Sequence, residues 1–134
     1  MLDANPMSQL IMVDLLRMII AGIDVCTMYP RDAPSEVVVV QRTGGQLQNT
    51  ITDGAAFAVQ CYAPDQTRAE ELATTVWHAL YRQRWAGLTV HGHMVRGWES
   101  YGAPQLLLDP DRPNAVRFQF AGRLLVSTLR NPAA

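Results

Sequence analysis

The chain has 134 residues, with 12 acidic and 11 basic side chains and a formal net charge of −1. This length predicts one domain that can bury a core without disulfides, and the charge balance argues against a main role in binding nucleic acid. Charged residues make up only 17%, which excludes a disordered tail and favours an oligomer. Every basic residue is arginine, which excludes a Schiff-base lysine and a phosphate-loop lysine.

The beginning of the chain lacks the basic leader of a secretory signal. Its longest apolar stretch, residues 10–23, contains Asp14 and Arg17 and is shorter than the roughly 20 residues that a membrane span needs. Two cysteines, Cys26 and Cys61, are too few for a disulfide scaffold. We therefore expect a soluble, intracellular protein with reduced thiols.

The first predicted element is a helix over residues 6–21. Asn5 is a suitable N-cap, and Pro6 fits the first helical position. Apolar residues cover more than half of the helix circumference and leave a narrow polar stripe at Asp14 and Arg17. Such a helix must be covered on two sides, so we expect a sheet on one side and a neighbouring subunit on the other.

Alternating or continuous apolar residues then predict three strands, over residues 23–29, 37–42 and 55–63. Gly44 and Gly45 are expected to end the second of these strands. The sequence between them and Asp53 contains few apolar residues. It is predicted to be a polar loop that becomes ordered on assembly.

The second helix is predicted from Thr67 to about Arg84, with Thr67 and Glu70 as a capping box. A strand-like segment follows over residues 88–101, and the closing strand covers residues 115–127. In that last strand, Gly122 is interpreted as a bulge.

The predicted order of elements is therefore α-β-β-β-α-β-β. This order indicates an α+β fold, with a mostly antiparallel sheet of about four to five strands and two helices packed on one face. We expect a single domain over residues 1–134, with a core of about residues 5–128.

His91 and His93 have the most metal-like spacing, because alternation along a strand would place both imidazoles on one face. A third ligand has no obvious source nearby, and the simpler interpretation is a pair of solvent-facing strand histidines beside a flexible glycine. Cys61 is interpreted as a buried hydrophobe, and Asp109 with Asp111 as turn residues. No catalytic constellation and no cofactor are predicted.

Several local sequences follow the apolar first helix in a fixed order. They are Arg42-Thr43-Gly44-Gly45, the strand Phe57-Ala58-Val59-Gln60-Cys61-Tyr62-Ala63, the helical Ala69-Glu70-Glu71-Leu72-Ala73 and the closing Val116-Arg117-Phe118-Gln119-Phe120. In this layout the chain resembles the tail terminator (tail completion, head–tail joining) proteins of long-tailed bacteriophages, over about residues 5–128.

The resemblance implies a non-enzymatic virion protein of the tail or neck, assembled in the host cytoplasm. Such proteins are expected to form a ring, commonly a hexamer, on the last ring of tail tube protein. The ring stops tube polymerisation and offers a docking surface to the head-completion or connector protein. DNA passes through the lumen without sequence-specific binding.

The resemblance also implies contacts between subunits or with the tube. The first candidates, Arg42, Gly44, Gly45 and Asp53, bound the predicted loop. The second, Leu10, Asp14 and Arg17, lie on the first helix. The third, Arg117 and Arg123, lie on the last strand.

Three alternatives remain open from the sequence. The first is another phage neck component, such as a head-completion or connector protein. The second is a small metal-binding enzyme that uses His91 and His93. The third is a nucleic-acid-binding module that uses four arginines, Arg82, Arg84, Arg96 and Arg117.

Overall fold

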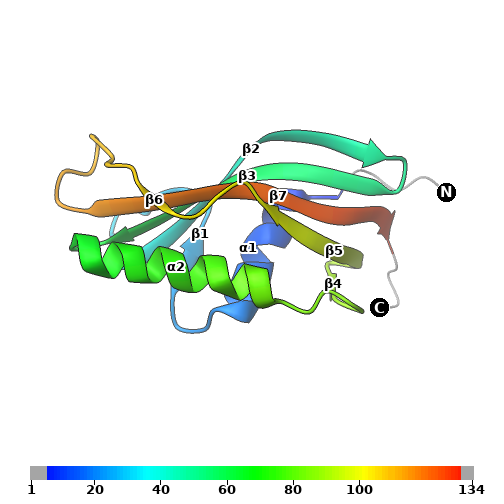
Figure 1. Cartoon of the computed structure of the whole chain (residues 1–134), viewed down its shortest axis with the longest axis horizontal. Helices are drawn as coiled ribbons and strands as arrows, with labels where there is room; N and C mark the ends of the chain where they lie inside the picture. The colour runs from blue at the N-terminus through cyan, green and yellow to red at the C-terminus, as the bar shows by residue number, and fades with distance from the viewer. Residues whose placement is uncertain (1–5, 131–134) are drawn as a thin grey trace.

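Seven strands form one curled sheet with two helices beside it, as Figure 1 shows for the computed structural model, which describes residues 6–130. The helices are α1 (Ser8–Ile19) and α2 (Gln66–Arg82). The strands are β1 (Asp24–Cys26), β2 (Val37–Asn49), β3 (Thr52–Ala63), β4 (Thr89–Val90), β5 (His93–Ser100), β6 (Gln105–Leu106) and β7 (Val116–Arg130). They are ordered β1-β2-β3-β7-β5-β4, with β6 beside β7. Only the β1–β2 pair is parallel among these described strands.

The core lies between the helices and one face of the sheet. Alternate side chains of the two central strands enter it, as the sequence predicts: Phe57, Val59 and Cys61 from β3, and Phe118 and Phe120 from β7. The α+β prediction is therefore confirmed, while the predicted number of strands is too low. Two of the additional strands, β4 and β6, have only two residues each, which is too short for a pattern of alternation to reveal.

Helix α1 is shorter than predicted, and its cap position is Met7, without a side-chain hydrogen bond. The predicted cap, Asn5, lies outside the described residues. Most apolar side chains of α1 are buried within the single chain, where α1 contacts α2 and four strands of the sheet, β1, β2, β4 and β7. Leu10 and Met18 remain exposed.

Helix α2 begins one residue earlier than predicted, because Asp65 is its N-cap. The Asp65 carboxylate accepts a hydrogen bond of 2.9 Å from the backbone N–H of Arg68. The predicted capping box of Thr67 and Glu70 is therefore wrong. An aspartate at the cap position satisfies the same free N–H groups that a threonine would.

The predicted polar loop before Asp53 is also wrong, because β2 continues through it to Asn49 and pairs with β3. Gly44 and Gly45 lie inside the strand, where the register shifts between Arg42 and Gly44. Gly45 has φ +95°, and a Cβ on it would lie 2.2 Å from the Gly54 carbonyl oxygen. The glycines therefore allow a close approach of two strands instead of ending one. We call residues 43–56 of this hairpin the arm.

Gly122 does not mark a bulge. It pairs in regular register with Phe57 on one side and Ser100 on the other. A Cβ on Gly122 would lie 2.3 Å from Cζ2 of Trp98, so the glycine makes room for the indole ring. Neither helix of residues 6–130 is long and apolar enough to cross a membrane.

Candidate functional site

The two histidines with metal-like spacing bond to different elements. His91 lies in the turn between β4 and β5 with φ 51°, and its Nε2 is 2.5 Å from Oδ2 of Asp14. His93 is buried, and its Nδ1 donates to the carbonyl oxygen of Ser127 at 2.8 Å. Within residues 6–130, no group of three or more His, Cys, Asp or Glu side chains is placed to hold a metal ion. The geometry thus gives both histidines structural partners.

Cys61 is fully buried in the core, and burial raises the pKa of its thiol. A thiol in such a site stays protonated and shielded from solvent. The interpretation of Cys61 as a buried hydrophobe therefore agrees with its position.

On α1, the predicted residues Asp14 and Arg17 hold the helix to its surroundings. The Arg17 guanidinium donates two hydrogen bonds to the carbonyl oxygen of Val25, at 2.8 and 3.2 Å. Asp14 lies between Arg17, at 3.4 Å, and His91. The third predicted residue of this helix, Leu10, is exposed and free to contact another molecule.

Two of the residues predicted to bound the polar loop interact within the hairpin, Arg42 from the base of the arm and Asp53 from its outer part, where it pairs with Leu47. Arg42 Nη2 is 4.0 Å from Oδ1 of Asp53, and Arg42 Nε donates to the Gly44 carbonyl oxygen at 3.2 Å. Asp53 is buried and also accepts a hydrogen bond of 2.6 Å from the Ser8 hydroxyl. These side chains join the arm to the start of α1.

A polar cluster on the helix-free face of the sheet surrounds Tyr62. The Tyr62 hydroxyl donates to Oδ2 of Asp109 at 2.8 Å, and Arg117 Nη1 is 3.8 Å from the same oxygen. Burial by itself would raise the pKa of Asp109, but the hydrogen bond from Tyr62, the backbone N–H of Asp111 and the charge of Arg117 together lower it. Burial and the bond to Asp109 raise the pKa of Tyr62. Asp109 therefore also bonds to Tyr62 and pairs with Arg117, in addition to its predicted place in a turn.

The same cluster also holds the segment after β6 against the sheet through hydrogen bonds and ring contacts. Arg117 Nε donates to the carbonyl oxygen of Leu107 at 2.7 Å. The Arg112 guanidinium stacks on the Tyr29 ring, 4.4 Å from its centroid, and Tyr29 meets Tyr62 edge to face. An open hollow of about 310 Å³ lies among these side chains. Sequence reasoning missed Tyr62, because its partners are 47 and 55 residues away along the chain.

Two other features of the helix-free face carry no net charge. Arg123, a predicted contact residue, donates a short hydrogen bond to Glu99 across the β5–β7 pair. A row of glutamines crosses four strands, because Gln60 pairs with Gln119, Gln119 pairs with Gln105, and the Gln60 amide donates to Gln41 at 3.3 Å. Such a face can hydrogen-bond a partner without a strong charge preference.

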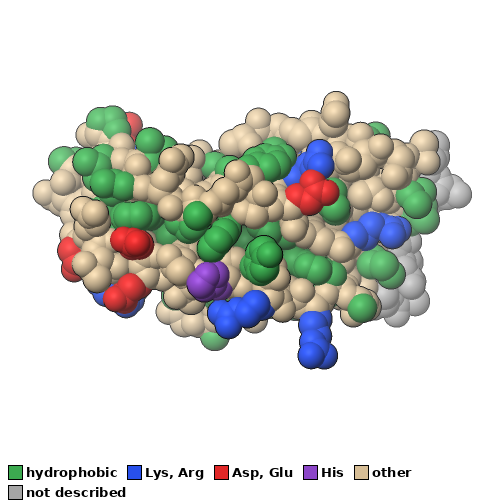
Figure 2. Space-filling model, viewed as in Figure 1, with side chains coloured by type: hydrophobic (Ala, Val, Ile, Leu, Met, Phe, Trp, Pro, Cys, Tyr) green, Lys and Arg blue, Asp and Glu red, His purple; other side chains and the backbone are tan. Residues whose placement is uncertain are grey.

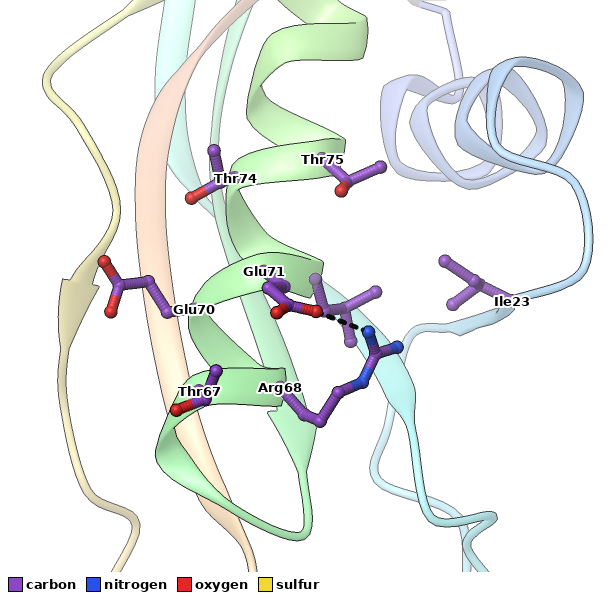
Figure 3. A pocket seen from close by; sticks show the side chains of 8 residues that line it. Ile23, Thr67, Arg68, Glu70, Glu71, Thr74 and Thr75 are labelled. Carbon is purple, nitrogen blue, oxygen red and sulfur yellow. Dashed lines mark hydrogen bonds and ion pairs between the residues drawn. The ribbon is translucent and has the colours of Figure 1, made fainter.

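A second hollow, of about 570 Å³, lies between the first half of α2 and the chain after α1 (Figure 3). Its side chains include Ile23, three threonines and the pair Arg68–Glu71, which are 2.6 Å apart. Arg68 also makes two hydrogen bonds of 2.8 Å to the carboxylate of Glu36. The charged groups therefore join α2 to Glu36, the residue before β2, and the lining residues form no nucleophile–base pair.

Of the thirteen large hydrophobic side chains that are exposed within residues 6–130, seven belong to two groups at different parts of the sheet, and the other six are scattered over α1, α2 and other segments. One group, which we call the arm-end surface, consists of Leu47, Ile51 and Leu129. Backbone hydrogen bonding of Thr128 to Ile51 brings the end of β7 beside the arm tip. The second group, the β6-end surface, consists of Tyr101, Leu106, Leu107 and Leu108. Figure 2 shows many hydrophobic side chains at the end of the molecule that carries β6.

In comparisons with known proteins, no protein-family model matches the chain, and no curated protein matches it.

Proposed function

We propose that this protein is a structural subunit of a phage virion, a tail terminator that forms a ring on the tail tube of a long-tailed phage. Six copies close the ring, stop tube polymerisation and offer a docking surface to the head-completion or connector protein. DNA passes through the lumen without sequence-specific binding. The role needs no cofactor and no catalytic group.

The observation that carries this proposal is the presence of two separate exposed apolar surfaces on one small domain. Leu108 and Leu129, one from each surface, are 61% and 60% exposed. Large apolar side chains in groups on a surface mark contacts with other molecules. A subunit of a ring needs one such surface toward each neighbour.

The layout of the chain supports the same proposal. Of the contact residues that the resemblance implies, Gly44 and Gly45 lie at the base of the arm beside Arg42, while Asp53 lies nearer its tip, opposite Leu47.

Light scattering behind a sizing column, followed by negative-stain imaging, tests the ring. We expect closed rings of about six copies, either from the protein alone or on preformed tail tubes. A protein that is monomeric in solution and absent from tube ends would overturn the proposal.

The choice between a terminator and another neck component depends on the partner. Purified protein added to polymerising tail tube subunits should give tubes of fixed maximum length with protein at one end. A ring that leaves tube growth unchanged but binds the head connector would instead identify a head-completion protein.

A further inference from the structure

We propose that copies of this chain associate head to tail, with the β6-end surface of one copy packed against the arm-end surface of the next. This inference rests on the proposed function and specifies the contact that builds the ring. The occupant of each surface is a second copy of this chain.

The two surfaces are far apart in one copy. Leu106 pairs with Phe118 near the start of β7, whereas Leu129 lies near its end. Eleven residues of strand separate Phe118 from Leu129, which corresponds to about 36 Å at about 3.3 Å per residue. The surfaces also differ in composition, so a contact between them is heterologous, and contacts of this type close into rings or extend into filaments.

The charges of α2 favour the same direction of association. Its acidic part, with Glu70, follows Ala63, which pairs with Val116 at the β6 end of the sheet. Its other end carries Arg82, with Arg84 just beyond it. Figure 2 shows acidic side chains at the left end and basic ones toward the right. These opposite charges attract each other between copies stacked head to tail.

Strand β1 pairs with β2 only at Val37–Val39, so the described structure leaves the outer edge of residues 41–49 without a strand partner. This edge carries Arg42 and register shifts between Arg42 and Gly44 and between Leu47 and Asn49, features that discourage pairing with another strand. The contact that we propose is therefore made by the side chains of the arm-end surface and not by strand pairing.

Two variants that each disable one surface test the direction of the contact. The arm variant carries Leu47→Gln and Ile51→Glu, because a glutamate at position 47 would stand opposite the Asp53 carboxylate. The β6 variant carries Leu106→Glu and Leu108→Glu. All four side chains are exposed in the single chain, so both variants should keep the wild-type circular dichroism and melting behaviour. A control with Met18→Glu and Tyr81→Glu changes two other exposed hydrophobic residues, outside the two surfaces.

The proposal predicts that each disabled variant fails to form rings, with association weakened at least about tenfold, while the control assembles like the wild type. An equimolar mixture of the two variants should form a complex of two copies in sedimentation velocity, because one intact arm end meets one intact β6 end. Neither variant should form this complex alone.

Other results overturn the head-to-tail contact. Variants that dimerise by themselves would indicate that like surfaces pair, and a mixture that stays monomeric would show that the surfaces do not meet. Rings that persist in both variants would place the contact elsewhere. In each case the wild-type rings remain, so these failures differ from the absence of rings that would overturn the proposed function.

Discussion

The hydroxyl of Ser8, at the start of α1, donates a hydrogen bond of 2.6 Å to the carboxylate of Asp53, 45 residues later in β3. Both residues are buried. The bond joins the first helix to the outer part of the arm, where Asp53 pairs with Leu47.

Replacing Ser8 by alanine should lower the free energy of unfolding by about 1–3 kcal/mol, because the buried Asp53 carboxylate loses a donor and cannot regain water. Urea unfolding measures this loss, with Ser35→Ala as the control at an exposed serine. Equal stability of the two variants would contradict the role assigned to the Ser8–Asp53 bond.

Gly45 should tolerate no side chain. The substitution Gly45→Ala is expected to destabilise the fold by at least about 2 kcal/mol, since it combines a left-handed φ with a Cβ that clashes with the β3 backbone. Gly97→Ala is the matched control, because a Cβ there meets nothing within 4 Å. That control should be neutral or stabilising by up to about 1 kcal/mol. Thermal unfolding of the two variants checks the difference, and similar melting temperatures would argue against the close strand approach at Gly45.

The sequence was sufficient to predict the helices and the core strands, because their apolar periodicity depends only on local spacing. Phe57, Val59 and Cys61 alternate as expected and enter the core. The predicted α+β class follows from the same patterns.

The arm, Gly122 and Tyr62 show where local sequence patterns are insufficient to predict the structure. Glycines and polar residues usually end a strand, yet here Gly45 permits a hairpin whose partner strand lies beyond the turn. At Gly122 the deciding neighbour is Trp98, 24 residues earlier. The Tyr62–Asp109 bond likewise depends on a chain path that no short motif encodes. Such contacts become visible only when the register of distant strands is known.

Protonation of the Asp109 carboxyl group at low pH should lower the free energy of unfolding. Its pKa in the folded protein is lowered, so it binds a proton less readily than in the unfolded chain. Its contribution is therefore fully present above the unfolded pKa and is lost as the pH falls through the folded pKa. Asp109→Asn keeps an acceptor for Tyr62 but removes the charge beside Arg117.

At neutral pH the Asp109→Asn variant should be less stable than the wild type by about 1 kcal/mol, a modest value because solvent reaches the cluster. The difference should shrink in urea titrations as the pH is lowered below about 4. Asp32→Asn, at an exposed aspartate, is the control and should show no such convergence. A constant difference at every pH would mean that the charge of Asp109 does not stabilise the fold.

The two histidines should respond differently to substitution, because only His93 is buried. A carbonyl oxygen can only accept, so the Nδ1 of His93 must carry the proton that bonds to Ser127. His93→Ala leaves that carbonyl without its partner and should lower the free energy of unfolding by about 1–3 kcal/mol. His91→Ala removes an exposed pair with Asp14 and should cost about 1 kcal/mol or less. Urea unfolding of both variants measures these losses. Zinc content, measured in the wild type and in both variants, tests the metal hypothesis separately. Stoichiometric zinc that both substitutions abolish would support a metal site at His91 and His93.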